Sequence, residues 1–69
     1  MNSGTRIDFN IAEAAHVSVR IYDVSGGLLK CLFDGRLSRG SYELFWNGAD
    51  ESENEVENGV YFCDVAIRQ

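Results

Sequence analysis

Proline is absent from this 69-residue chain, and positive charge is scarce, with six Lys and Arg residues against eleven Asp and Glu residues. A net charge of −5 excludes the basic surface that nucleic-acid binding needs and disfavours attraction to anionic membranes. No apolar run approaches the roughly 20 residues of a membrane span, and Met1 does not begin a signal-peptide pattern. We therefore expect no nucleic-acid partner and no membrane span, with any export signal lying upstream.

The remaining composition is that of a small folded domain, 45% hydrophobic and 12% aromatic. A chain of this size buries only about 60% of the surface that its unfolded form exposes, so its core must be thin. We expect residues 1–69 to form a single domain, which is a fragment of a larger exported protein.

Apolar side chains recur at every second position, which is typical of half-buried β-strands. The alternation predicts strands at residues 5–11, 17–22, 41–46 and 60–67. Residues 28–33 are apolar on both faces, which indicates a central strand. Turn signals occupy residues 23–27, and loops are expected around residues 34–40 and 47–58. The pattern predicts an all-β fold, a small immunoglobulin-like β-sandwich of six or seven antiparallel strands.

The predicted core is closed by two aromatic residues at its ends. Trp46 ends a strand, where it covers the open end of a thin core. Tyr61 is expected to bury its ring while its hydroxyl finds a backbone partner, as tyrosines do at sandwich corners. Glycines are expected to serve the turns and the re-entry into the sheet after the long loop. The structural residues predicted in this way are Val17, Val19, Ile21, Gly26, Leu29, Leu44, Trp46, Gly48, Gly59, Tyr61 and Val65.

Cys31 and Cys63 are the only thiols, and their separation fits no zinc-binding pattern. Two alternatives stay open for them. They are small buried apolar residues, or they form a disulfide if their two strands are neighbours.

The acidic loop at residues 50–57 is the one candidate metal site, and a weak one. Asp50, Ser52 and Asn54 alternate like the first ligands of a calcium loop. However, Glu55 stands where that loop needs glycine, and Tyr61 stands where it needs an acidic ligand. A solvated acidic loop is the favoured interpretation.

No constellation of residues predicts catalysis. His16 is the only histidine and has no cysteine or acidic residue at ligand spacing, and Ser25 lacks the glycine pattern of a nucleophile elbow. We therefore expect no catalytic or cofactor site. One hypothesis is a carbohydrate-binding platform formed by the aromatic residues that the alternation turns away from the core, Tyr22, Phe45 and Phe62. The favoured interpretation is that these aromatic residues line the second side of the sheet or a contact with a neighbour, because a sugar site also needs converging polar groups.

Three stretches carry a family resemblance, namely VSVRIYDVSGGLL at 17–29, RGSYELFWNGAD at 39–50 and NGVYF at 58–62. Together they resemble the Ig-like domain of the flagellar hook-capping protein and of C-terminal domains of secreted bacterial proteins, including type IX secretion sorting domains. Members of that family usually have a glycine near Glu53, and here Asn54 is expected to take the left-handed conformation instead. The family pattern also runs on into one more strand, so the final strand is expected to be missing.

The resemblance implies a non-catalytic C-terminal accessory module of a secreted bacterial protein, used for sorting or surface attachment, with an extracellular or cell-surface location and no cofactor. The alternative that it implies is a structural building block completed by strand addition from a neighbour, as in a hook cap or filament. A carbohydrate-binding module is the third hypothesis. Expected partners are the rest of the parent protein, and the export machinery or a neighbouring copy at an exposed strand edge.

Overall fold

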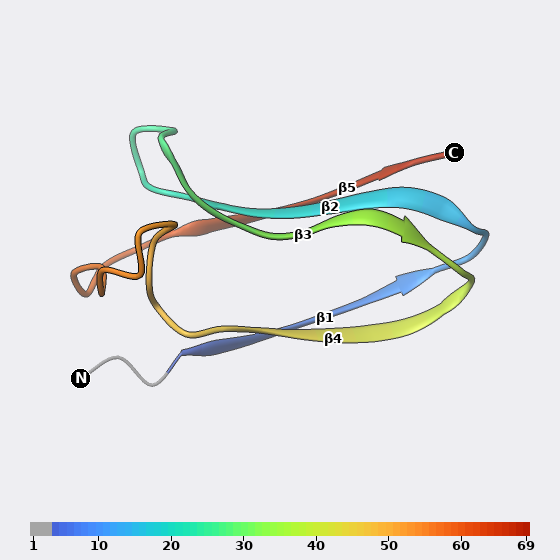
Figure 1. Cartoon of the computed structure of the whole chain (residues 1–69), viewed down its shortest axis with the longest axis horizontal. Coiled ribbons are helices and arrows are strands. Elements are labelled where there is room, and N and C mark those ends of the chain that lie inside the picture. Colours follow the sequence, from blue (N-terminus) through green and yellow to red (C-terminus); the bar gives the residue numbers. More distant parts are fainter. Residues whose placement is uncertain (1–3) are drawn as a thin grey trace.

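The computed structural model describes residues 4–69, so residues 1–3 of the predicted domain lie outside the described part. Residues 4–69 form five antiparallel strands, which lie in two facing layers (Figure 1). One sheet pairs β1 with β4, and the other has the order β3-β2-β5. The predicted all-β sandwich is confirmed, with five strands within residues 4–69 in place of six or seven. The strands are β1 (Thr5–Ile11), β2 (Ala15–Tyr22), β3 (Leu28–Leu37), β4 (Gly40–Trp46) and β5 (Phe62–Arg68).

The centre of the fold is β2, which pairs with β3 on one side and β5 on the other. Its inward-facing residues Ala15, Val17 and Val19 are fully buried, and with Ile11 of β1 they form the core cluster. The connections from β1 to β2 and from β3 to β4 each cross from one sheet to the other (Figure 1).

The prediction of a central strand at residues 28–33 is wrong, because β3 is an edge strand. Val19 pairs with Phe33 and Arg20 with Cys31, so a register shift leaves Leu32 as an extra residue. Such a bulge can turn two successive residues toward the same side, and Leu32 and Phe33 both pack against the core. The doubly apolar pattern therefore reflects a bulge and not a strand buried on both faces.

The strand boundaries differ from the sequence prediction by two residues or more at β2, β3 and β5. β2 begins at Ala15, two residues before its predicted start. β3 continues through Asp34 and Gly35, which were expected to lie in a loop, because these residues pair with Ser18 and Val17 of β2. β5 begins at Phe62, so Val60 and Tyr61, which were expected to begin this strand, belong to the preceding loop. Residues 4–69 contain no helix that is long and apolar enough to cross a membrane.

The predicted core residues divide into a buried and a partly buried group. Most of the buried residues lie on the inner face of β2. The partly buried residues lie on the surrounding strands and in the last loop, because the two-stranded sheet cannot cover the whole inner face of the three-stranded sheet. Buried are Val17, Val19, Ile21 and Trp46, and partly buried are Leu29, Leu44, Tyr61 and Val65.

Candidate interaction edge

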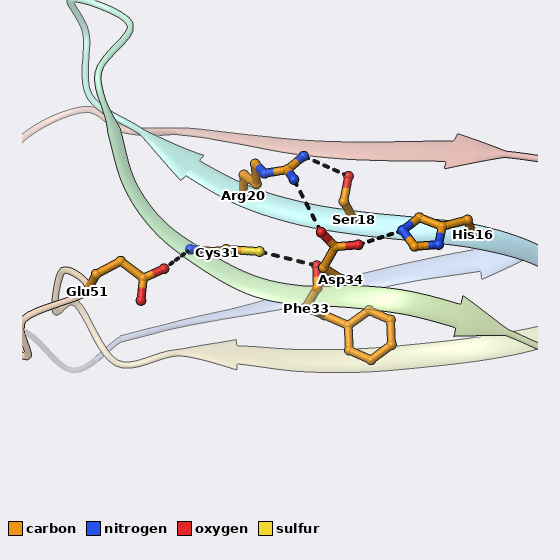
Figure 2. Close-up of polar contacts among 7 residues, drawn as sticks. All are labelled: His16, Ser18, Arg20, Cys31, Phe33, Asp34 and Glu51. Atoms are coloured by element: carbon orange, nitrogen blue, oxygen red, sulfur yellow. Dashed lines mark hydrogen bonds and ion pairs between the residues drawn. The ribbon is translucent and has the colours of Figure 1, made fainter.

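The free edge of β3 is covered by the acidic loop. The backbone N–H of Glu51 donates to the carbonyl of Leu29 at 3.0 Å, and Glu51 Oε2 accepts the backbone N–H of Cys31 at 2.8 Å (Figure 2). Beside them, Lys30 Nζ donates to Glu53 Oε2 at 2.7 Å. Backbone groups that would otherwise be open to another strand are thus satisfied from within the chain.

Asp50, one of the three weak metal-ligand candidates, closes this loop through its carboxylate. Asp50 Oδ1 accepts the backbone N–H groups of Ser52 and Asn54, each at 2.9 Å. The N–H of Asp50 donates in turn to the carbonyl of Asn54 at 2.9 Å. Within residues 4–69 no three His, Cys, Asp or Glu side chains are grouped as metal ligands. The alternation of Asp50, Ser52 and Asn54 is therefore the signature of a turn that caps itself through a side chain.

Trp46 and Tyr61 anchor the two ends of the long loop. Trp46 is 6% exposed, and its Nε1–H donates to the carbonyl of Ala49 at 2.9 Å. The Tyr61 ring meets the Trp46 ring edge-on, with centroids 5.4 Å apart, and the Tyr61 hydroxyl donates to the carbonyl of Glu57. Both aromatic residues bury apolar surface and satisfy a loop carbonyl, so they fix where the chain re-enters β5.

Gly48 holds the base of the same loop. Its φ of 82° lies in the left-handed region, and its carbonyl accepts the N–H of Val56 at 2.9 Å. The next residue pair in the loop, Ala49 and Glu55, forms an isolated antiparallel β-bridge. Gly59, in contrast, has no left-handed φ, and a β-carbon there would meet only the Tyr61 ring at 4.0 Å, so its geometry does not demand glycine.

The free edge of β5 has no such cover. β5 pairs only with β2, and among residues 4–69 no backbone hydrogen bond reaches its outer side. Ile67 is 45% exposed although its cross-strand partner Val17 is fully buried. Cys63 is likewise exposed beside the buried Ile21. The inner face of the sandwich is therefore open along β5.

An uncharged groove lies where β5 and the preceding loop approach β1. It has a volume of about 340 Å³ and includes Ile7, Ile21, Trp46, Tyr61 and Cys63 in its lining, with no charged residue. Val60 and Phe62, which are 66% and 56% exposed, are also among the lining residues. An open strand edge beside an uncharged groove is the combination that accepts an added strand.

Of the two alternatives for Cys31 and Cys63, the disulfide is not formed, and both thiols are free. The alternative of two buried residues is wrong for Cys63, which is exposed, while Cys31 is partly buried. The two cysteines lie on β3 and β5, which are separated by β2. Two strand spacings amount to about 9.5 Å, whereas a disulfide needs β-carbons about 4 Å apart. Partial burial of the Cys63 sulfur, aided by the neighbouring Asp64, raises the pKa of this thiol although the residue as a whole is exposed. Cys63 therefore remains a protonated thiol at neutral pH and lacks the character of a reactive thiolate.

The residue types of a hydrolase triad meet on the outer face of the β3-β2-β5 sheet, but their hydrogen bonds are arranged differently (Figure 2). Asp34 is the shared acceptor, taking His16 Nε2 at 2.5 Å and Arg20 at 3.3 Å. The Ser18 hydroxyl accepts from Arg20 at 3.0 Å. A triad requires the serine to donate to the histidine. Here the serine is joined to an arginine, which is the arrangement of a surface ion-pair network.

The outward aromatic residues do not assemble into one sugar-binding platform. Tyr22 and Phe62 are cross-strand neighbours in the three-stranded sheet. Phe45 lies on β4 of the other sheet, paired with Arg6 and 62% exposed. Because successive strand residues face opposite sides, Phe45 points away from the sandwich on the side opposite to Tyr22 and Phe62.

Sequence reasoning missed Glu51, the residue that covers the β3 edge. Its side chain reaches an amide 20 residues earlier in the chain, and no local pattern encodes such a contact. The acidic character of residues 50–57 was the one available signal, since charge placed along an edge is a common way to block strand addition.

Taken with the two-layer topology, these features define an immunoglobulin-like sandwich module whose three-stranded sheet has a covered edge at β3 and an edge without such cover at β5. The family model described as the FlgD Ig-like domain matches residues 2–68, and the chain belongs to that family. This confirms the resemblance to the hook-capping protein. The solved structure of FlgD from P. aeruginosa matches with a TM-score of 0.79 and 25% identity, over 91% of this chain and 48% of that one. The chain thus spans about half the length of that FlgD chain. No curated protein gives a significant match.

Proposed function

We propose that this domain is a non-catalytic building block of an extracellular assembly of the hook-cap type, carried within a longer exported polypeptide. Two findings support this role. The chain belongs to the FlgD Ig-like family, and the similar FlgD chain from P. aeruginosa extends well beyond the matched region. Neither match names a sorting domain, so the assembly hypothesis has more support than the sorting hypothesis that the sequence first favoured.

The observation that carries the proposal is the contrast between the two edges of one sheet. Along β3, Glu51 forms hydrogen bonds with the carbonyl of Leu29 and with the N–H of Cys31. β5 contains no proline, and its only charged residues are Asp64 and, at the end of the strand, Arg68. Natural sheets usually block a free edge with charge, proline, a bulge or a covering segment. An edge left open beside an uncharged groove is suited to recognition by strand addition, in which main-chain bonds give affinity and side-chain pockets give specificity.

The rest of the fold provides a rigid support for this edge. β2 is buried at its centre and holds β5 in register over seven residue pairs, from His16 with Arg68 to Tyr22 with Phe62. The Trp46 and Tyr61 contacts fix the segment that leads into β5. Partners of the open edge would come from the remainder of the parent protein, from the export machinery or from neighbouring subunits.

The proposal can be tested with a lysine placed on the open edge of the parent protein. Ile67→Lys puts a charge on the inner face of β5, where it opposes strand addition. Val24→Lys is the matched control, because Val24 is 71% exposed in the turn between β2 and β3. Cells that produce each variant are examined by electron microscopy for extracellular structures and by immunoblot for exported protein.

An assembly role predicts that Ile67→Lys abolishes or truncates the extracellular structure while export is normal, and that Val24→Lys changes neither. Normal assembly with Ile67→Lys would overturn the proposal. Loss of export with Ile67→Lys alone would also overturn it, because that result indicates sorting.

A further inference from the structure

A row of basic residues crosses one end of the outer face of the β3-β2-β5 sheet. His16 of β2 lies opposite Arg36 of β3 on one side and opposite Arg68 of β5 on the other. His16 stands between the fully buried Ala15 and Val17, so it and its two cross-strand partners face outward. Adjacent strands are about 4.8 Å apart. The two arginines therefore flank the imidazole on one line across the sheet, and this line is the basic row.

The arginines of the basic row have no acidic partner in the described part of the chain. Within residues 4–69 the side chains of Arg36 and Arg68 form no ion pair or hydrogen bond. Asp34, two residues before Arg36 on the same face, accepts instead from His16 at 2.5 Å and from Arg20 at 3.3 Å (Figure 2). Charges of like sign on adjacent strands destabilise a sheet. The basic row is thus unfavourable for the fold alone and suited to an anionic ligand.

Charge on this face differs from charge on the rest of the chain. Three of the six basic residues but only two of the eleven acidic residues lie on it. These residues are Arg20, Arg36, Arg68, Asp34 and Asp64. An acidic partner is therefore repelled by most of the molecule and accepted at this face, which is the kind of complementarity that orients an encounter.

The other end of the same face carries an apolar row. Tyr22 of β2 lies opposite Leu28 of β3 and Phe62 of β5. Leu28 is 53% exposed and Phe62 is 56% exposed. Outward positions of a sheet with one solvated face are usually polar, and large apolar side chains that are exposed together mark interaction sites. Tyr22 is six residues from His16, so the apolar row and the basic row are about 20 Å apart.

We infer that the outer face of the β3-β2-β5 sheet binds an acidic segment of a partner protein, which places carboxylates on the basic row and an apolar side chain on the apolar row. Arginine pairs with carboxylates through two parallel hydrogen bonds, and about six extended residues span the distance between the rows. This surface is separate from the β5 edge used in the proposed function. A strand added beside β5 lies next to the sheet and leaves its outer face accessible.

A synthetic peptide titrated into the ¹⁵N-labelled complete chain and followed by NMR tests the inference. The peptide carries a Phe-Leu pair, a spacer of about six Ser and Gly residues and three glutamates. We expect the amides of residues 16–22 to shift, since β2 connects the two rows. A peptide with lysines in place of the glutamates should bind far more weakly, and so should one whose spacer is too short to reach both rows.

Two variants with matched controls locate the contact. Arg36→Gln should weaken binding of the glutamate peptide by about fivefold, as expected for one exposed ion pair. Because Arg36 lies on β3, strand addition at β5 would not produce this effect. Arg6→Gln makes the same change in charge on the other sheet and should leave the affinity within about twofold of wild type.

Phe62→Ser tests the apolar row and should also weaken binding by about fivefold, through lost apolar contact. Phe45→Ser is its control, because Phe45 is 62% exposed on the opposite side of the sandwich, and it should leave the affinity within about twofold of wild type. Melting curves confirm that each variant is folded before its affinity is compared.

Absence of shifts at millimolar glutamate peptide, equal binding of the lysine peptide, or no effect of Arg36→Gln would each overturn the inference. Polygalacturonate is titrated in parallel as an anionic polymer without apolar side chains. If it binds as tightly as the glutamate peptide and Phe62→Ser weakens neither, the face binds polysaccharide and the inference is wrong. These outcomes are independent of the Ile67→Lys experiment, which changes the inner face of β5.

Discussion

Gly26 and Glu53 occupy the same position in two loops of the same construction, and both have a left-handed backbone, with φ of 90° and 65°. Each is the fourth residue of a loop that begins with aspartate, and each donates its N–H to that aspartate's carbonyl, at 3.0 Å for Asp23 and 2.9 Å for Asp50. The expectation that Asn54 takes the left-handed conformation is wrong, because Glu53 takes it. Glu53 is the only non-glycine residue with positive φ among residues 4–69.

Glu53 should be less well suited to its backbone than glycine, and two substitutions isolate this effect. Glu53→Gly and Glu53→Ala both lose the ion pair with Lys30, but only alanine keeps a β-carbon in the left-handed region. We expect Glu53→Gly to unfold in urea with a free energy about 1 kcal/mol higher than Glu53→Ala. Equal stabilities would show that this loop relaxes away from the left-handed conformation.

The cover of the β3 edge should be measurable at a single amide. Glu51→Ala removes the carboxylate that accepts the Cys31 N–H, and the exchange of that amide with solvent should become roughly fivefold faster, which corresponds to about 1 kcal/mol. Hydrogen exchange followed by NMR reports it directly. Glu57→Ala serves as the control for the change in charge, and faster Cys31 exchange there would argue against a specific contact.

The strict alternation of apolar and polar residues was sufficient to predict the strands that have this pattern. Residues 5–11 and 41–46 were predicted almost to their boundaries, since one face packs on the core and the other faces solvent. β3 was misjudged for two physical reasons. A bulge at Leu32 disguised its alternation, and Asp34 followed by Gly35 resembles a turn, although Asp34 lies on an outer face bound to His16 and Arg20.

The site was less predictable than the fold, because it depends on contacts between distant segments. The sequence motifs were enough to indicate the family and an exposed strand edge. They could not indicate that Glu51 covers β3, or that β2 separates Cys31 from Cys63, since both depend on the order of strands in the sheet. That order is decided by tertiary packing and not by any local pattern.

Trp46 should be the largest single contributor among the side chains at the loop end of the sandwich. Trp46→Ala removes a side chain that is 6% exposed, together with its contact to the Tyr61 ring. We expect a loss of about 3–5 kcal/mol, enough to unfold a marginal domain of this size. Trp46→Phe keeps most of the volume but loses the Nε1–H bond to Ala49, and it should retain a cooperative transition at lower temperature. A melting curve for Trp46→Ala that matches wild type would contradict the packing described for this residue.

The two thiols should react separately. Alkylation of the native protein without reductant, followed by mass spectrometry, should modify both cysteines, with exposed Cys63 ahead of partly buried Cys31. Because the pKa of the Cys63 thiol is raised by burial and by Asp64, its alkylation should accelerate as pH rises well above neutral. Protein that resists alkylation until reductant is added would show that the strands can rearrange to join the thiols.

The turn that opens at Asp23 should make part of the stability depend on pH. Its Oδ1 accepts the N–H of Gly27 at 2.8 Å, the hydroxyl of Ser25 at 2.8 Å and the N–H of Ser25 at 3.0 Å. These bonds, that from Gly27 first, hold the pKa of the Asp23 carboxyl below its usual range. A carboxyl whose pKa is lower in the folded state stabilises the fold above its unfolded pKa, and this contribution disappears as pH falls through the folded pKa.

Asp23→Asn should therefore be less stable than wild type near neutral pH, and the difference should shrink as the solution is made acid. Urea unfolding of both proteins across a series of pH values measures it, and the similar contribution from Glu53, whose pKa is lowered by Lys30, cancels because both proteins retain that pair. Ser25→Ala removes only the hydroxyl bond and should show an intermediate dependence. A constant offset between wild type and Asp23→Asn from neutral to acid pH would mean that the charge of Asp23 does not stabilise the turn.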